Sequence, residues 1–375
     1  MSRARAATRV TAATGAALAL TLVLAACGQD SNRGGGGGGD RDPEAEGGTI
    51  GIAMPTKSSE RWVADGNNMV QQFEDAGYDT VLQYGENRVE NQVSQIENMI
   101  SQRVDLLVIA AIDGSAMTNV LQQAHDAGIP VVSYDRLLLG SEYVEYYASF
   151  DNERVGRLQG EYIVEALGLA DGSEEGPFHI ELFAGSSDDN NTQYFFQGAM
   201  EVLQPYLDSG QLVVRSGQTK LSQITTAAWD GGRAQSRMDD LLTAHYSGQR
   251  LDAVLSPYDG ISIGILSSLK SIGYGSGSQP FPIITGQDAE LASIKSIIDG
   301  EQTQTVYKDT RELARQAVAM SDALLTGGEA EVNDTESYDN GVKVVPAFLL
   351  DPVSMDASNY QILIDEGYYK ESDLG

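Results

Sequence analysis

Charged, amide and aromatic side chains recur in short segments that follow apolar, β-branched runs. They are Arg61 and Trp62; Asp135 and Arg136; Asp189, Asn190 and Asn191; Trp229; Tyr258 and Asp259; Asp288; and Lys308. Planar Asp, Asn and Arg groups can hold pairs of hydroxyls, because each hydroxyl both donates and accepts a hydrogen bond. Aromatic rings pack against the C–H faces of a sugar ring. The set therefore favours binding of a free sugar.

The charges in this set nearly cancel. Three cations offset three acids: Arg61, Arg136 and Lys308 against Asp135, Asp259 and Asp288. Because unpaired buried charge is costly, the balance predicts a nearly neutral pocket for an uncharged ligand. Other interpretations remain open, since Asp259 can cap a helix, Arg61 can be an exposed helix charge, and either tryptophan can belong to a core or a surface.

The polar segments lie at the ends of predicted strands. The first series of strands comprises Thr49–Met54, Thr80–Tyr84, Leu106–Ile109, Val131–Tyr134 and Val144–Ser149. The second comprises Phe178–Phe183, Leu212–Arg215, Ala253–Ser256, Ile283–Thr285 and Thr303–Tyr307. Stretches of helical period separate them, as in parallel sheets with helices on both faces. Two doubly wound α/β domains are therefore expected, with ligands at the carboxyl ends of the strands.

The N-terminal part of the chain has the features of an export signal. A basic start and an apolar run occupy residues 1–26, which we interpret as a lipoprotein signal peptide. The run ends in Leu24-Ala25-Ala26-Cys27, which resembles the lipobox of bacterial lipoproteins, so Cys27 is the expected site of lipidation. Residues 27–48 include six consecutive glycines and an acidic Pro/Gly stretch, a composition typical of a flexible tether.

Charge and motifs exclude several classes of function. A formal net charge of −30 makes nucleic acid an unsuitable partner. The G-x-S-x-G pattern at Gly260–Gly264 fits a hydrolase nucleophile. A hydrolase of that kind needs a histidine after the serine, but all three histidines precede it, so we predict that the chain is not an enzyme. Neither a metal-ligand spacing nor a nucleotide-binding glycine motif occurs, and no metal or cofactor is expected.

At the same loops the chain resembles the periplasmic binding proteins of the ribose/galactose/xylose class, and most closely their multiple-sugar (aldose) binding members. The matching segments are Met54–Lys57 with Glu60–Trp62, Tyr134–Arg136, Gly185–Asn191, Ser256–Gly260, Gly286–Ala289 and Tyr307–Asp309. The resemblance covers essentially Ile50 to the C-terminus. It implies the type I periplasmic binding protein fold, in which two similar domains joined by three crossing segments close over one sugar.

Carried over residue by residue, the resemblance implies that the set above holds the sugar, with Trp229 as a stacking plate. An asparagine usually stands at the position of Tyr258, which leaves Tyr258 and Asp259 as alternatives, as are Asn190 and Asn191. The domains are expected at 49–150 with 309–345, and at 151–308 with 346–375. The implied crossings lie near Ser149–Asn152, Lys308–Thr310 and Val345–Ala347.

The resemblance also implies the partners. These are a monosaccharide (an aldopyranose such as xylose, glucose, galactose or arabinose) and the permease of an ABC importer with its cytoplasmic ATPase. We expect a monomer, held outside the cytoplasm on the cell membrane by its lipid. A repressor of the same fold would carry a helix-turn-helix where this chain has an export signal. A sensory binding protein that presents its sugar to a chemoreceptor or sensor kinase remains the alternative.

Overall fold

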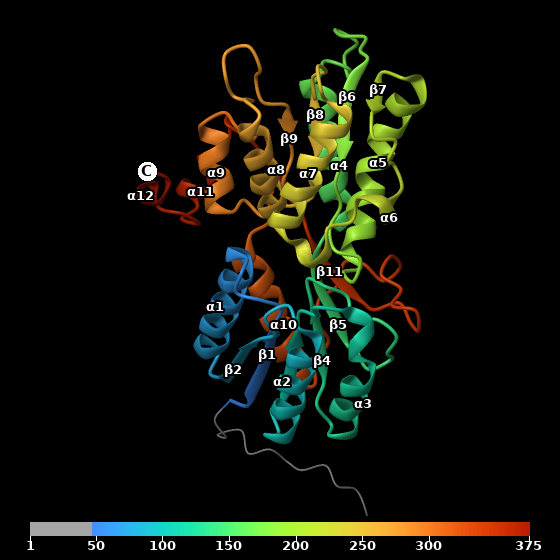
Figure 1. Cartoon of the computed structure of the whole chain (residues 1–375). Helices are drawn as coiled ribbons and strands as arrows, with labels where there is room; N and C mark the ends of the chain where they lie inside the picture. The colour runs from blue at the N-terminus through green and yellow to red at the C-terminus, as the bar shows by residue number, and fades with distance from the viewer. Residues whose placement is uncertain (1–46) are drawn as a thin grey trace, which may run out of the picture. The chain divides into compact units, whose positions relative to one another are not determined.

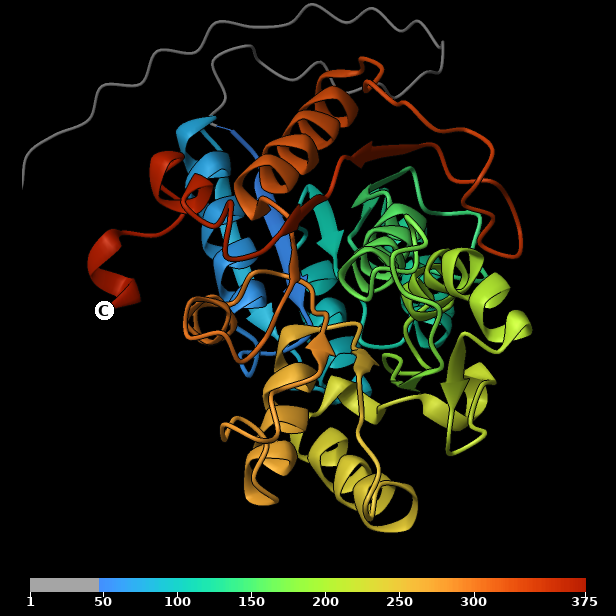
Figure 2. The same cartoon turned by 90° about the horizontal axis from the view of Figure 1, so that it is seen from above.

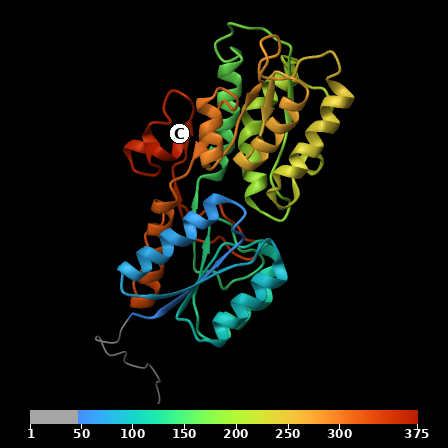
Figure 3. The ribbon, with the colours of Figure 1, turned by 60° about the vertical axis from the view of Figure 1, so that its left-hand side comes forward.

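The computed structural model describes residues 47–375, which fall within one compact unit. Figures 1 and 3 show two groups of strands in it, each flanked by helices, which we call the first and second lobes. The predicted signal peptide, Cys27 and the predicted tether as far as residue 46 lie outside the described residues. Within residues 47–375, no helix is long and apolar enough to cross a membrane.

The first lobe is built on a six-stranded parallel sheet. In spatial order its strands are β11 (Ala347–Leu350), β5 (Tyr146–Phe150), β4 (Val131–Tyr134), β3 (Leu106–Ile109), β1 (Thr49–Met54) and β2 (Asp79–Tyr84). Ile50, Ile52 and Met54 pack into one core and Ala53 into the other, because alternate side chains of a strand point to opposite faces. Burial on both faces accounts for the continuous apolar runs.

Helices cover both faces of this sheet. On one face α1 (Glu60–Asp75) packs with α10 (Thr310–Thr326), which lies beside it in Figure 2. On the other face lie α2 (Val89–Ser101) and α3 (Thr118–Asp126), the latter preceded by the 3-10 turn Gly114–Met117. The predicted α/β class is confirmed, and α1 places Arg61 and Trp62 directly after the first strand.

The second lobe contains a four-stranded parallel sheet. Its order is β7 (Leu212–Val214), β6 (Phe178–Leu182), β8 (Ala253–Leu255) and β9 (Ile283–Ile284). The helices α4 (Asn152–Ala166) and α5 (Asn191–Ser209) cover one face, and α7 (Gly231–His245) and α8 (Asp259–Ser271) the other. Two short helical turns, α6 (Leu221–Ile224) and η2 (Ala227–Trp229), connect β7 to α7.

A small layer completes the second lobe. Its antiparallel pair β10 (Thr305–Tyr307) and β12 (Val353–Met355) contributes to one core with α9 (Leu291–Ile298), α11 (Ile362–Asp365) and α12 (Glu371–Leu374). The start of α5 is fixed by close packing on α4, because a Cβ at Gly156 would lie only 1.9 Å from the Phe195 carbonyl oxygen. This packing holds Asn191 at the boundary between the lobes.

The chain passes between the lobes three times. The first passage lies between β5 and α4 and the second between β10 and α10, both near the expected positions. The third differs from the prediction. Ala347–Leu350 pairs in parallel with Tyr147–Phe150, so these residues belong to the first lobe, and the chain leaves it only before Val353. The predicted boundary at 345–347 therefore lies too early.

Candidate ligand-binding site

A cavity of about 240 Å³ lies between the lobes, at the carboxyl ends of their strands. This volume is below the ~300–1,000 Å³ typical of drug-sized ligands, and therefore suits a smaller molecule. The predicted residues that line it are Arg61, Trp62, Asp135, Arg136, Asp189, Asn191, Trp229, Tyr258, Asp288 and Lys308. Further lining residues include Thr56, Ser59, Asn87, Phe195, Gln287 and Glu290. The fold thus gathers side chains that are up to 252 positions apart, from Thr56 to Lys308.

Arg61 is the charged hub of the first-lobe wall. Its Nη2 donates to Asp135 Oδ2, its Nε donates to Asp65 Oδ2 at 2.9 Å, and its Nη1 lies 3.5 Å from Asp288 Oδ1. Burial alone would lower the pKa of Arg61, but the three carboxylates hold that pKa well above its usual value. Burial would likewise raise the pKa of Asp135, yet Arg61 and Lys308 keep it below its usual value. Both groups are therefore charged at neutral pH.

Asp135 is held in an unusual backbone conformation. Its φ is +57°, and the amide of Arg136 donates to the carbonyl of Tyr134 in a tight turn at the end of β4. The Asp135 carbonyl oxygen accepts hydrogen bonds from Tyr147, from Ser149 at 3.2 Å, and from Asn191 Nδ2 at 2.8 Å. Strained backbone of this kind concentrates at ligand sites, where surrounding contacts over-determine it.

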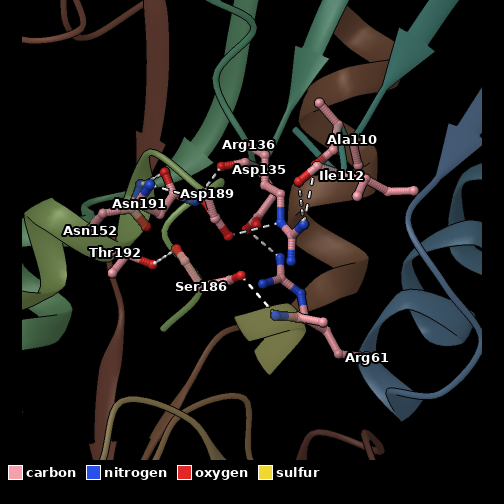
Figure 4. A network of polar contacts seen from close by, with 12 residues as sticks. Arg61, Ala110, Ile112, Asp135, Arg136, Asn152, Ser186, Asp189, Asn191 and Thr192 are labelled. Carbon is pink, nitrogen blue, oxygen red and sulfur yellow. Dashed lines mark hydrogen bonds and ion pairs between the residues drawn. The ribbon is translucent and has the colours of Figure 1, made fainter. Parts of the chain in front are cut away.

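Arg136 faces the second lobe. Its Nε lies 2.9 Å from Asp189 Oδ2, and the two side chains point toward each other in Figure 4. Its Nη1 donates to the carbonyl of Ala111 at 3.1 Å. The Trp62 ring lies beneath both cations, with its centroid 4.6 Å from the Arg61 guanidinium carbon and 5.1 Å from that of Arg136. Cation–π contacts at this range hold the two guanidinium groups side by side. Trp62 therefore supports the cations.

Trp229 forms the aromatic part of the second-lobe wall. Its ring meets Phe195 and Tyr258 edge to face, with centroids 6.1 and 6.0 Å away. Trp229 and Ala228 both have φ of +56°, which is uncommon for residues other than glycine. The ring also lies against Gly185, where a Cβ would be 2.0 Å from its Cη2 atom. Only glycine leaves room for the indole there.

Asp288 and Lys308 complete the set of paired charges that line the cavity. Lys308 Nζ lies 3.0 Å from Asp288 Oδ1 and 3.8 Å from Asp135 Oδ2. Asp288 follows β9 with φ of +90°, so a second acid of the cavity also occupies strained backbone. Lys308 is 1% exposed. One ammonium therefore joins a carboxylate from each lobe.

Glu290 lines the cavity although no pattern in the sequence singled it out. Its Oε1 accepts from Ser59 Oγ of the first lobe at 2.8 Å and from the Tyr258 hydroxyl at 2.7 Å. Burial raises the pKa of Glu290 to about 7, with Asp288 and Glu60 adding to the rise and the two hydrogen bonds opposing it. Its position two residues after Asp288, where α9 begins, was the available signal.

Two predicted residues lie outside the cavity wall. Asn190 accepts from Gln193 at the start of α5 and borders a separate surface cavity. Asp259 is fully buried, where it accepts from Gln302 Nε2, Thr305 Oγ1 and the backbone amide of Glu290. Burial, with Glu290 adding to it, raises the pKa of Asp259 well above its usual value. Asn191 and Tyr258 are therefore the members of each pair that face the cavity.

The charge balance also differs in its members from the prediction. Asp189, rather than Asp259, pairs with the third cation of the cavity, Arg136, and Glu290 adds a further acid.

Among residues 47–375, no cluster of His, Cys, Asp and Glu side chains could hold a metal ion. Ser262 of the G-x-S-x-G pattern is buried within α8 and donates to the carbonyl of Thr285 at 2.7 Å, away from the cavity.

Comparisons with known proteins agree with this architecture. Residues 50–329 match the family model of the periplasmic binding protein domain. The multiple sugar-binding periplasmic protein SbpA of Azospirillum brasilense is 64% identical over 325 residues, covering 86% of this chain and 90% of that protein. The multiple sugar-binding periplasmic receptor ChvE of Rhizobium radiobacter is 58% identical, covering 88% of this chain and 93% of that protein.

A solved structure is similarly close. The ABC transporter solute-binding protein of Clostridium phytofermentans, crystallised with bound β-D-glucose, superimposes with a TM-score of 0.84 at 50% identity. The match covers 87% of this chain and the whole of that one.

Proposed function

This chain belongs to the periplasmic binding protein family, and from that premise we propose that it captures a monosaccharide outside the cytoplasm and delivers it to an ABC importer. The ligand is an aldopyranose such as glucose, xylose, galactose or arabinose, held between the two lobes. The sugar-binding functions of the relatives and the glucose bound to a solved relative support this class of ligand.

The observation that carries the proposal is the internal pairing of the cavity's charges. Arg61 and Lys308 pair with Asp135 and Asp288, and Arg136 pairs with Asp189. A charged ligand would have to displace one of these partners and leave it buried and unpaired, which costs several kcal/mol. A neutral sugar adds hydroxyls to ion pairs that stay intact, and hydrogen bonds to charged groups are the stronger kind.

Two further wall residues carry buried polar atoms that suit hydroxyls. Trp229 Nε1, a donor, and Gln287 Oε1, an acceptor, have no hydrogen-bond partner within residues 47–375. Buried polar atoms of native proteins are normally satisfied, so each is a candidate contact for a bound molecule. A hydroxyl can meet either need, because it donates and accepts.

We infer that the chain performs no chemistry on the sugar. Its family consists of substrate-binding proteins, and Ser262, the one nucleophile suggested by a sequence motif, donates its hydroxyl to Ser256 and the Thr285 carbonyl, away from the cavity. Asp135, Asp189 and Asp288 pair with cations, and Glu290 accepts hydrogen bonds from Ser59 and Tyr258. Capture and release therefore require only that the lobes open and close.

Anchoring by Cys27 is a further part of the proposal. The lipobox-like Leu24–Cys27 at the end of the apolar run supports it, and the glycine-rich segment behind Cys27 suits a spacer between a membrane and the described unit. Lipid on Cys27 would keep the binding protein close to its permease. We further propose that it acts there as a monomer, because one chain contributes both walls of the cavity.

Sugar sensing is the second candidate function, favoured by the description of the 58% identical relative as a receptor. Deleting the gene distinguishes the two. Loss of sugar uptake would support delivery to an importer, whereas loss of a sugar-induced response with uptake intact would support sensing.

Calorimetric titration and thermal unfolding with D-glucose, D-galactose, D-xylose, L-arabinose and D-ribose test the ligand class. At 100 times its Kd a ligand adds about 2.7 kcal/mol of stability, which gives a measurable rise in the unfolding temperature. We expect saturable binding of at least one aldopyranose. A folded protein that shows neither heat of binding nor a shift with any of the five would contradict the proposal.

A further inference from the structure

Asp65 is a fully buried carboxylate that lies behind the wall of the cavity. It is on α1, one helical turn after Arg61, and is 0% exposed. It does not line the cavity itself. Its Oδ2 accepts from Arg61 Nε at 2.9 Å, and its Oδ1 accepts from the Tyr134 hydroxyl. Both carboxylate oxygens of Asp65 therefore accept from residues at the ligand site. Arg61 lines the cavity, and Tyr134 directly precedes the lining residue Asp135.

These contacts tie α1 to the end of β4 at two points. Tyr134 holds Asp65, while its neighbour Asp135 turns back through its positive φ and accepts from Arg61 Nη2. The guanidinium of Arg61 therefore donates to Asp65 through Nε and to Asp135 through Nη2. Its Nη1 remains directed toward Asp288, across the cavity.

A helix and a sheet do not require a buried charge to pack together. Replacing buried ion pairs by apolar groups is often neutral or stabilising, so a carboxylate here costs free energy that apolar packing would avoid. Burial raises the pKa of Asp65 to about 6, with Asp135 adding to the rise, while Arg61 and the Tyr134 hydroxyl oppose it. The group is thus largely ionised at neutral pH, as a partner for Arg61 must be.

We propose that Asp65 is a positioning residue for sugar specificity: it fixes the orientation of Arg61, so that the guanidinium holds one particular hydroxyl of the sugar. The inference rests on the proposed function, because it takes Arg61 to be a sugar contact. Without Asp65 the Arg61 side chain keeps its charge and its bond to Asp135 but can rotate about it. Discrimination at that hydroxyl is then lost.

The test compares D-glucose with its 2-deoxy, 3-deoxy, 4-deoxy and 6-deoxy analogues in calorimetric titrations. For each analogue, the ratio of its Kd to that of glucose measures the penalty for the missing hydroxyl. The hydroxyl that Arg61 holds is the one whose penalty collapses in Arg61→Gln. We expect Asp65→Asn to reduce the same penalty by about fivefold, the value of one hydrogen bond, and to leave the other penalties within twofold of the parent.

Matched variants separate positioning from stability. Asn68→Ala removes a polar contact of the same helix, from Asn68 Nδ2 to Thr310 Oγ1, away from the cavity, and should leave every penalty unchanged. Tyr134→Phe keeps the Asp65 carboxylate but removes the hydroxyl that donates to its Oδ1. This variant should reduce the penalty at the same sugar hydroxyl as Asp65→Asn does, but to a smaller extent. This variant also decides the question if Asp65→Asn does not fold.

The outcomes are distinct. Two results would overturn the inference, because each would show that Asp65 only ties helix to sheet. One is that Asp65→Asn weakens the binding of glucose and of all four analogues equally. The other is that the penalties in Asp65→Asn and Tyr134→Phe match those of the parent. If the parent protein binds another of the five aldoses instead of glucose, the deoxy analogues of that aldose replace those of glucose. Failure of the parent to bind any of the five would instead count against the proposed function, before any variant is compared.

Discussion

The Lys308 ammonium lies 3.0 Å from Asp288 Oδ1, and the two side chains are 1% and 7% exposed. The same ammonium lies 3.8 Å from Asp135. Removing it would leave two buried carboxylates with Arg61 as their remaining cation. Breaking a buried pair in this way costs about 3 to 5 kcal/mol, far more than the pair itself contributes.

Lys308→Met should therefore lower the free energy of unfolding by about that amount in urea titrations. Lys270→Met is the matched control, because Lys270 forms a 2.6 Å pair with Glu301 in which its side chain is 47% exposed. An exposed pair contributes at most about 1 kcal/mol. Equal effects of the two substitutions would show that burial of Lys308 has no energetic consequence.

Gly185 provides the space for the Trp229 ring. An alanine there would place its Cβ 2.0 Å from the indole and force the ring out of position. Gly185→Ala should weaken all pyranoses by similar factors of about tenfold, as should Trp229→Ala, because stacking depends little on which hydroxyls are present. Titration with four aldoses measures this.

Gly277→Ala serves as the control, since nothing lies within 4 Å of a Cβ at that position. Sugar should also perturb the tryptophan fluorescence of the parent protein. A change confined to one aldose in Gly185→Ala would argue against a stacking role for Trp229.

Glu290 should make stability depend on pH. Its folded-state pKa of about 7 exceeds the ordinary value of 4.5, so between these values the folded protein binds its proton more tightly than the unfolded chain does. The free energy of unfolding therefore falls as the pH rises through that window, by up to about 3 kcal/mol from this group. Glu290→Gln, facing the same Ser59, Tyr258, Glu60 and Asp288, removes this contribution.

Urea unfolding at pH 4.5, 6 and 8 checks the sign. The variant should gain stability relative to the parent as the pH rises. If the free energies of unfolding of the two proteins changed in parallel with pH, the pKa of Glu290 would not be raised in the folded protein.

Cys27 is the only cysteine of the chain, so its substitution tests the anchor cleanly. Cys27→Ser should move the protein from the membrane fraction to the soluble extracytoplasmic fraction, and mass spectrometry should show lipid on the parent alone. A variant that stays on the membrane and is processed at the same site would contradict lipidation at Cys27.

Much of the fold follows from local sequence pattern. The strands Thr49–Met54, Leu106–Ile109 and Val131–Tyr134 begin and end as predicted, because strands buried on both faces are continuous apolar runs. The last crossing was misplaced because β11 is an edge strand with mostly half-buried residues, and its pairing with β5 is a contact between distant segments. No local pattern specifies such a pairing.

The loops that form the site were predictable from the sequence, but which residue of each loop points into the cavity was not. Tyr258 and Asp259 are adjacent at the start of α8. The three groups that bond Asp259 come from the residue before α9, from the turn after α9 and from β10. Which residue turns toward the cavity therefore depends on partners some thirty to fifty positions away. The role of Asp65 was unpredictable for the same reason, since its partner Tyr134 lies 69 positions further along the chain.

Calorimetric titration of the parent, Asp135→Ala and Asp288→Ala with D-glucose, D-galactose, D-xylose and L-arabinose tests the central claim most directly. Each carboxylate should accept charge-assisted hydrogen bonds worth about 1.5 to 3 kcal/mol, so each variant should lose roughly tenfold to a hundredfold in affinity and change its order of preference among the sugars. Affinities that stay at the parent values in both variants would place the sugar outside the cavity between the lobes.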